Sequence, residues 1–283
     1  MRINLAKSAG FCFGVKRALK IAFETASWKT RAYILGDIVH NESVVRELEK
    51  AGIRKIRKLS YGKNKTLLIR AHGAGKDILN KASHLGYNVI DATCPMVREI
   101  HKIAQAMEQK GYKIIIIGDK EHDEVRGISG QLKEKAIIID NPKEIPLKKI
   151  KRINKAAIVV QSTQDLEKVI GIVNILKTYL KDLKFFNTIC MPTRIKQEEI
   201  KTMALDNDVV IVIGSKASAN TKRLYKISKS LNQRTYWVRS KDEIKPGWLK
   251  DAKNVGITAG ASTPDSTTED VVKYLQQLRL HHY

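Results

Sequence analysis

The chain has 283 residues, of which 43% are hydrophobic, and its 52 Lys and Arg residues against 29 Asp and Glu give a formal net charge of +23. It contains no run of the roughly 18 apolar residues that a membrane-spanning helix needs, so a packed soluble core is expected. The N-terminal stretch MRINLAKSAGFCFGVKRALK lacks the continuous apolar block of a signal peptide. These features predict a cytoplasmic protein without membrane association.

The excess of positive charge suggests nucleic acid, an anionic membrane or an acidic protein as partner. The basic residues are spread along the chain, with local runs at 54–65 and 148–155, and Tyr61 is the only aromatic residue in either run. Because single-stranded nucleic-acid sites stack bases on aromatic side chains, a solvated basic surface is favoured over a nucleic-acid site. An acidic redox partner would also suit this charge.

Three cysteines, Cys12, Cys94 and Cys190, are separated by 82 and 96 residues. These spacings exclude a CxxC zinc knuckle and a local ferredoxin-type cluster motif. An odd number of cysteines in a cytosolic chain also makes structural disulfides unexpected. Either the three are unrelated buried thiols, or the fold gathers them.

Taken in chain order, the predicted elements repeat after each cysteine. A helix comes first, at residues 12–26, 94–111 and 190–205. An apolar strand then ends in glycine, in AYILGD (Gly36), IIIIGD (Gly118) and VIVIGS (Gly214). The cysteine and the glycine are 24 residues apart in all three cases, which indicates an internal repeat.

The repeat continues with a polar loop and a helix, at residues 36–50, 118–132 and 214–231. A second apolar strand follows in TLLIRAHGAG, AAIVVQSTQD and VGITAGASTPD, then another helix, and in the first two repeats a strand that runs to the next cysteine. Short apolar strands that alternate with helices predict parallel sheets. We therefore expect an α/β fold of three similar parallel-sheet lobes, at 1–93, 94–189 and 190–283. A pseudo-threefold arrangement would turn the carboxyl ends of their strands toward one central cavity, where parallel sheets bind ligands.

Each cysteine would then lie at the start of a helix, where the dipole and the unpaired N–H groups favour the thiolate. Pro95 suits the first helical position after Cys94 because its missing N–H costs nothing there. Three thiolates can hold zinc with one open position, or a [4Fe–4S] cluster with one iron free of protein thiolate. Zinc hydrolases more often use His and carboxylate ligands, so the three thiolates favour iron and sulfur.

A second set of polar residues also lies at predicted strand ends just before helices, where backbone N–H groups bind phosphate. Neither a GxxxxGK[ST] loop nor a GxGxxG fingerprint is present, so a small anion such as a diphosphate is favoured over a nucleotide. His84, His101, His281 and His282 lack this placement and are expected to be structural. The set consists of His40, His72, His122, Ser218, Asn220 and Ser262.

Glu124 is the acidic residue that stands out, two residues after His122. A carboxyl group in an apolar, water-poor cavity can have a raised pKa and serve as a proton donor. Thr163 or Ser162, in VVQSTQD, would pass or orient that proton. A plain charge at a helix N-terminus is the simpler alternative for Glu124.

The motifs GFCFGV, VHNE, AHG, DATCP, HDEV, QST, GSKASAN and TAGAS resemble, in order from Gly10 to Asp265, those of the LytB family. This family comprises 4-hydroxy-3-methylbut-2-enyl diphosphate reductases, the last enzymes of the methylerythritol phosphate route to isoprenoids. The resemblance implies one oxygen-sensitive [4Fe–4S] cluster on Cys12, Cys94 and Cys190, with a unique iron open to the substrate. It further implies reductive removal of the substrate hydroxyl, with two electrons and two protons, to give isopentenyl and dimethylallyl diphosphate.

The resemblance also assigns roles to the other predicted site residues. Glu124 matches the proton source and Thr163 its relay, while His122 contributes to the polar network. The diphosphate cradle corresponds to His40, His72, Ser218, Asn220 and Ser262. Electrons would come from an acidic donor such as ferredoxin or flavodoxin, which gives the positive charge a use, and the protein is expected to be a monomer.

Two positions depart from the family pattern. Ala219 stands where many members have a second serine, so one hydroxyl donor to the diphosphate is missing. Asp123 stands where a proline often precedes the glutamate, and an ionised Asp123 close to Glu124 would raise the pKa of Glu124. Neither change removes a cluster ligand or the acid, so an active enzyme is expected.

Two other functions remain open on these residues. A redox-neutral dehydratase of the quinolinate synthase type would also use three cysteines and an open iron, but needs no external electrons. A basic nucleic-acid-binding protein with a sensory cluster would bind RNA or DNA with a steep salt dependence and show no turnover.

Overall fold

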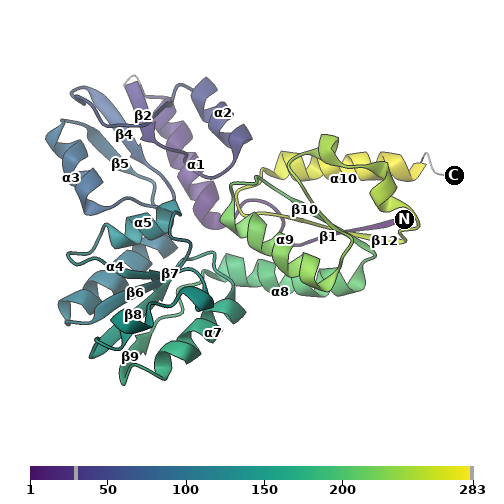
Figure 1. Cartoon of the computed structure of the whole chain (residues 1–283). Helices are drawn as coiled ribbons and strands as arrows, with labels where there is room; N and C mark the ends of the chain where they lie inside the picture. Colours follow the sequence, from purple (N-terminus) through teal and green to yellow (C-terminus); the bar gives the residue numbers. More distant parts are fainter. Residues whose placement is uncertain (29–30, 281–283) are drawn as a thin grey trace. The chain divides into compact units, whose positions relative to one another are not determined.

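The computed structural model describes residues 1–28 and 31–280, so that the predicted structural residues His281 and His282 lie outside the described ranges. Three four-stranded sheets are present in these residues, and all of their strand pairings are parallel. Figure 1 shows helices packed on the faces of each sheet. The predicted α/β fold with three parallel-sheet lobes is confirmed, while the arrangement of the lobes around a central cavity stays a prediction.

The first sheet has the strand order β3 (Arg54–Ile56), β2 (Arg31–Leu35), β4 (Lys65–Ile69) and β5 (Asn88–Asp91). Its associated helices in the chain are α1 (Phe13–Ala26), α2 (Glu42–Lys50) and α3 (Lys76–His84).

The second sheet has the order β7 (Ile137–Ile139), β6 (Lys113–Ile117), β8 (Lys155–Val160) and β9 (Asp182–Phe185). The helices of this part are α4 (Pro95–Gln109), α5 (Asp123–Ser129), α6 (Leu147–Ile150) and α7 (Leu166–Lys177), with a 3₁₀ turn η1 (Pro142–Glu144).

The third sheet has the order β1 (Arg2–Leu5), β12 (Asn254–Ala259), β10 (Val209–Ile213) and β11 (Thr235–Val238). Its helices are α8 (Met191–Asp206), α9 (Ala219–Leu231) and α10 (Asp265–Leu280), with 3₁₀ turns η2 (Lys241–Glu243) and η3 (Pro246–Leu249).

The N-terminal strand β1 belongs to the third sheet and not to the first. β1 pairs with β12, from Arg2 beside Asn254 to Leu5 beside Ile257, although its residues fall in the range 1–93 predicted for the first lobe. β5 and β9 hold the same edge position in their own sheets, and each leads to a cysteine. β1 likewise leads to Cys12. The first strand of the chain therefore supplies the fourth strand of the last sheet.

The described chain divides into two compact units by its internal contacts. The two-sheet unit, Lys16–Val39 with Val45–Cys190, contains the first and second sheets. The one-sheet unit, Met1–Val15 with His40–Val44 and Met191–Tyr283, contains the third sheet. The predicted boundaries at 93/94 and 189/190 stay predictions.

The central strands are buried on both faces, as expected for parallel sheets covered by helices. In β6, Ile115 and Ile117 pack with Val169 and Ile172 of α7, while Ile114 and Ile116 pack with Ile100 of α4. In β10 all five residues are buried, with Val209, Ile211 and Ile213 on the α10 side. Burial of each such side chain stabilises the fold by roughly 1.5–3 kcal/mol. This packing holds the strand ends rigid, and the site residues follow those ends.

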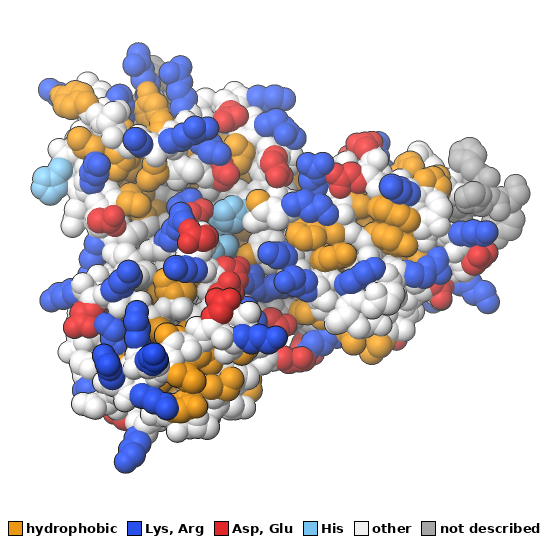
Figure 2. All heavy atoms as spheres, in the orientation of Figure 1, with side chains coloured by type: hydrophobic (Ala, Val, Ile, Leu, Met, Phe, Trp, Pro, Cys, Tyr) orange, Lys and Arg blue, Asp and Glu red, His pale blue; other side chains and the backbone are white. Residues whose placement is uncertain are grey.

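Lys and Arg side chains are spread over the face of the molecule shown in Figure 2 rather than gathered into one stripe. This distribution is typical of a solvated basic surface and not of a groove that follows a nucleic-acid backbone. No helix in the described residues combines the length and the apolar character that crossing a bilayer requires.

Candidate functional site

All three cysteines lie at helix starts, as the sequence predicts. Cys12 immediately precedes α1, Cys94 is the N-cap of α4 with Pro95 in the first turn, and Cys190 immediately precedes α8. The three residues are half-buried. A thiol in this position lies near the positive end of the helix dipole.

The backbone of each cysteine is fixed by an equivalent hydrogen bond. The N–H of Cys12 donates to the carbonyl of Ala261 at 3.2 Å. The N–H of Cys94 donates to Ala71 at 3.0 Å, and that of Cys190 donates to Ser162 at 3.0 Å. Each acceptor lies two residues beyond the end of a central strand, in β12, β4 and β8 respectively. The internal repeat of the sequence is therefore repeated in the geometry around the thiols.

Glu124 is buried at the N-terminus of α5, with an exposed fraction of 1%. Its carboxylate accepts two hydrogen bonds from Ser162, one from the backbone N–H at 2.6 Å and one from Oγ at 2.7 Å. The carbonyl of the same Ser162 accepts the N–H of Cys190. One residue therefore connects the candidate acid to the backbone of a candidate cluster ligand.

The hydroxyl of Thr163 makes a different contact, because successive residues of this turn point in different directions. Thr163 Oγ1 accepts a hydrogen bond from Gln161 Nε2 at 3.0 Å. Of the two hydroxyls considered for the relay, the Ser162 hydroxyl is the one hydrogen-bonded to Glu124, and the relay role of Thr163 stays a prediction.

His72 and His122 lie together in the two-sheet unit, with ring centroids 5.3 Å apart and ring planes nearly perpendicular. His122 is the N-cap of α5, and its Nδ1 accepts the backbone N–H of Glu124 at 3.2 Å. A neutral His122 ring must then carry its proton on Nε2, which leaves that atom as a donor.

Asp123, which departs from the predicted family pattern, forms an ion pair with Arg70. Arg70 Nη1 lies 2.5 Å from Asp123 Oδ2, and both side chains are about four-fifths buried, with exposed fractions of 18% and 20%. Arg70 immediately follows β4, at the carboxyl edge of the first sheet. The extra carboxylate beside Glu124 is thus held in an ion pair, and its predicted effect on the pKa of Glu124 stays a prediction.

Three further residues predicted for anion binding lie in the one-sheet unit. Ser218, Asn220 and Ser262 have exposed fractions of 4%, 4% and 7%. Ser218 caps α9 by accepting the N–H of Thr221 at 3.3 Å, and Ser262 Oγ donates to the carbonyl of His40 at 3.3 Å. The amide nitrogen of Asn220 has no hydrogen-bond partner among the described residues. A buried amide without a partner is costly, which indicates a ligand at this position.

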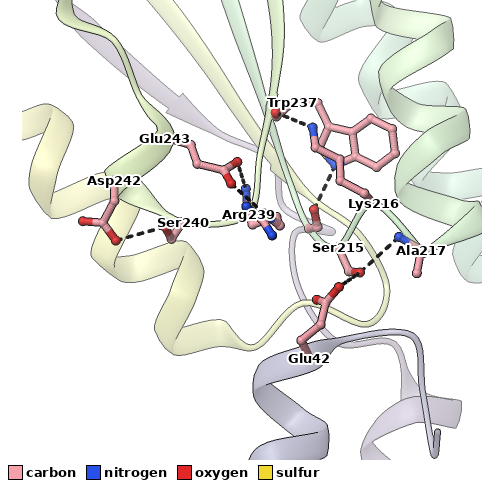
Figure 3. A network of polar contacts seen from close by, with 10 residues as sticks. Glu42, Ser215, Lys216, Ala217, Trp237, Arg239, Ser240, Asp242 and Glu243 are labelled. Carbon is pink, nitrogen blue, oxygen red and sulfur yellow. Dashed lines mark hydrogen bonds and ion pairs between the residues drawn. The ribbon is translucent and has the colours of Figure 1, made fainter. Parts of the chain in front are cut away.

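A polar network supports the loop before α9, which ends at Ser218 (Figure 3). Ser215 Oγ donates to Glu42 Oε1 at 2.9 Å and accepts the N–H of Ala217 at 3.1 Å. Lys216 Nζ donates to the carbonyl of Trp237 at 2.7 Å and stands 4.2 Å from the centre of its indole ring. Burial lowers the pKa of Lys216. The network ties the segment His40–Val44 to the loop before α9.

Ala219 is 8% exposed and occupies the first position of α9. The hydroxyl that the family resemblance predicts at this position would lie between Ser218 and Asn220 in the chain. The structure shows no compensating change that we can connect with Ala219.

Sequence reasoning missed Lys196 of α8. Its exposed fraction is 2%, and its Nζ donates to the carbonyls of Ser8, Gly10 and Ala259. Burial lowers the pKa of Lys196 to about 8, while the charges of Cys12, Glu199 and Asp265 raise it. The signal was present in the sequence, because Lys196 falls on the same helical face as Ile200 and Met203.

The profile of the LytB protein family matches residues 3–276 of this chain. The chain belongs to the LytB family. Proteins named 4-hydroxy-3-methylbut-2-enyl diphosphate reductase show the same relationship over nearly the whole length. The one from Clostridioides difficile is 39% identical over 98% of this chain and 100% of its own length. The one from Aquifex aeolicus is 38% identical over 98% of this chain and 96% of its own length.

Solved LytB structures have the same fold. A structure titled (E)-4-hydroxy-3-methyl-but-2-enyl diphosphate reductase, the terminal enzyme of the non-mevalonate pathway, is 38% identical and aligns with a TM-score of 0.73. It covers 98% of this chain and 100% of its own. The reductase from Plasmodium falciparum is 29% identical and aligns with a TM-score of 0.89 over 97% of this chain and 87% of its own.

The donors of this LytB chain fit an iron–sulfur cluster. Thiolates are the usual ligands of such clusters, and the chain offers three thiols at helix N-termini with equivalent backbone restraints. Cys94 and Cys190 belong to the two-sheet unit with Glu124, His72 and His122. The one-sheet unit contains Cys12, His40, Ser218, Asn220 and Ser262.

Proposed function

We propose that the chain is a 4-hydroxy-3-methylbut-2-enyl diphosphate reductase that holds one [4Fe–4S] cluster on Cys12, Cys94 and Cys190. It would convert its substrate to isopentenyl and dimethylallyl diphosphate, with two electrons and two protons and the loss of water. Membership of the LytB family over residues 3–276 supports this proposal. The observation that carries it is the connection from buried Glu124 through Ser162 to the backbone of Cys190.

The bound cluster would supply electrons and one iron with an open coordination position, which acts as a Lewis acid toward the substrate hydroxyl. Glu124 would hold the proton that the departing oxygen needs. Its burial keeps bulk water away from that proton, and the two hydrogen bonds from Ser162 fix the orientation of the carboxyl group. Ser162 Oγ is the hydroxyl best placed to pass the proton, with Thr163 beside it in the turn.

The diphosphate would bind to imidazoles, hydroxyls and one amide at helix N-termini. Asn220 would donate through the amide nitrogen that lacks a protein partner, and Ser218 would bind at the cap of α9. His122 would donate through Nε2, which carries the proton of the neutral ring because Nδ1 accepts the N–H of Glu124. The remaining members of the proposed cradle are His40, His72 and Ser262.

The electron donor would be a small acidic protein such as ferredoxin or flavodoxin, since the chain carries a net charge of +23 and Lys and Arg side chains are spread over the face shown in Figure 2. The cytoplasmic location and the monomeric state stay predictions, as does the absence of a directly bound nucleotide cofactor.

An anaerobic assay tests the proposal. The protein is purified without oxygen, its iron and sulfide are counted, and 4-hydroxy-3-methylbut-2-enyl diphosphate is added with a reduced viologen dye. About four irons per chain and dye oxidation that requires the substrate are expected. Cys94→Ser should lose both, whereas retention of the cluster and full activity in that variant would contradict the assigned ligand set.

Two other outcomes would overturn the reductase proposal. A reconstituted cluster without dye oxidation would favour a redox-neutral dehydratase or a cluster sensor. A protein that takes up no iron under reducing conditions would mean that the threefold cysteine pattern serves only the architecture.

A further inference from the structure

The three candidate cluster ligands do not follow their strands at equal distances. Two residues separate β5 from Cys94, and four separate β9 from Cys190. Six residues, 6–11, separate β1 from Cys12. A longer loop has more conformations to lose when it is ordered, so Cys12 needs more restraint than the other two cysteines.

Two charged side chains of α8 supply that restraint. Lys196 donates to the carbonyls of Ser8 and Gly10, the latter at 3.1 Å, and also to Ala259 at 3.1 Å. Three acceptors match the three protons of an ammonium group, so no donor is left over. Glu199, one helical turn later, accepts the backbone N–H of Lys7 at 2.6 Å and that of Ser8 at 3.0 Å.

Lys196 differs from Glu199 in what it joins. Glu199 binds only the start of the loop, whereas Lys196 connects the loop at Gly10 with the end of β12 at Ala259. Cys12 lies two residues beyond Gly10, and its N–H donates to Ala261, two residues beyond Ala259. The ammonium group therefore bridges both segments that determine where the Cys12 backbone lies.

The burial of Lys196 excludes a role at the surface. The side chain is 2% exposed and lies on the face of α8 that also buries Ile200 and Met203. A buried ammonium group is costly unless all of its hydrogen bonds are made. An apolar residue would suit the packing, so the charge is best explained by the three carbonyls that it binds.

We infer that Lys196 is a positioning residue that holds the Cys12 loop in place for ligand binding. This inference rests on the proposed function for the purpose of the restraint. The restraint itself can be measured at the thiol, whether or not a cluster is present.

The test is competitive alkylation of the three cysteines in the full-length protein, purified anaerobically and read out by mass spectrometry. In Lys196→Met the labelling of Cys12, relative to Cys94 and Cys190, should rise about tenfold, because three unsatisfied carbonyls favour opening of the loop. Lys196→Arg should keep the wild-type ratio. Lys201→Met, on the same helix at a partly exposed position, is the matched control and should also keep it.

A folded Lys196→Met protein with the wild-type labelling ratio would overturn the inference. An equal rise at all three cysteines would also overturn it, because Lys196 would then support the whole fold. Lys196→Gln, which keeps a polar group but cannot reach three carbonyls, gives the same readout if the Met variant does not fold. The iron content of the wild-type protein separately tests the proposed function.

Discussion

At the scale of single residues, hydrogen bonds and ion pairs distinguish two adjacent carboxyl groups, only one of which is the proposed proton donor. Glu124 and Asp123 are neighbours in the chain, yet Glu124 binds Ser162 whereas Asp123 pairs with Arg70. Burial and partner, rather than residue type, distinguish the proposed acid from the ion-paired carboxylate.

Glu124→Gln should leave cluster content and substrate binding unchanged but lower kcat by about a hundredfold. The amide oxygen can still accept the backbone N–H of Ser162 and the amide NH2 can donate to Ser162 Oγ, but the amide cannot deliver a proton. Iron analysis and single-turnover kinetics with a reduced dye would measure the two effects separately. A near wild-type kcat would remove Glu124 from the acid role.

The hydroxyl contact predicts a difference between Ser162 and Thr163. Ser162→Ala removes a hydrogen bond of 2.7 Å to the Glu124 carboxylate, whereas Thr163→Ala removes one from Gln161. We expect the Ser162 variant to lose about tenfold more in kcat than the Thr163 variant, at equal KM and iron content. The opposite order would assign the relay to Thr163.

His101, buried in α4, predicts a pH dependence of stability. Burial lowers its pKa from 6.5 to about 4, while Asp91 raises the pKa and Arg98 lowers it further. Because the unfolded chain binds the proton more tightly, the histidine destabilises the folded state as pH falls from about 6.5 toward 4. The loss should reach roughly 3 kcal/mol. His101→Gln should lack this slope in urea unfolding, and His84→Gln, at an exposed position of α3, should retain it.

At the scale of elements, glycine has opposite roles at two positions of the second lobe. Gly118 follows β6, where an added Cβ would lie 2.6 Å from Val125 Cγ2 and 2.9 Å from Gln161 Cβ. Gly171 lies inside α7, with no atom within 4 Å of an added Cβ. The first glycine allows the strand end to pack closely against α5 and the turn after β8, whereas the second only weakens its helix.

These two glycines give a matched pair of substitutions. Gly118→Ala should lower the free energy of unfolding by about 1–3 kcal/mol through overpacking. Gly171→Ala should raise it by about 0.5–1 kcal/mol through helix propensity. Denaturation curves of both variants would measure this, and a neutral Gly118→Ala would show that the strand end has room to relax.

Most helices and strands could be predicted because each has its own local pattern of apolar residues. The second sheet was recognisable from runs such as IIII in β6 and IVV in β8, which are buried on both faces. β1 was not assigned to its sheet, because RINL has no distinctive pattern and its partner β12 begins about 250 residues later, at Asn254. Pairing over such a distance is decided by tertiary packing and not by local propensity.

The site was predictable to the extent that it follows the repeat. The cysteines and the polar residues after each glycine could be proposed because three copies could be compared, and their roles stay predictions. Ser162 could not be separated from Thr163, since two hydroxyls in one turn differ only in direction. Lys196 was missed because the helical pattern of α8 indicates only that this position is buried. It does not predict the three backbone carbonyls that the ammonium group binds.

At the scale of the whole molecule, the charge of +23 is the property that neither the fold nor the proposed chemistry requires. A basic surface attracts an acidic electron carrier over distances of a Debye length, about 10 Å at 0.1 M salt, and speeds its encounter. If the proposed acidic carrier is the electron donor, we expect the charge to affect the rate of electron delivery and to leave the reaction within the site unchanged.

Salt should then affect the two routes of electron supply differently. With reduced ferredoxin or flavodoxin as donor, kcat/KM for the donor should fall by about tenfold between low salt and 0.3 M NaCl, because screening weakens attraction between opposite charges. With a reduced viologen, which is cationic, the rate should stay constant or rise with salt, since screening then weakens repulsion. Parallel assays across a salt series, with the substrate diphosphate saturating, would show this divergence. An equal fall with both donors would instead place the salt effect on binding of the anionic substrate, and the excess of lysine and arginine would have no part in donor recognition.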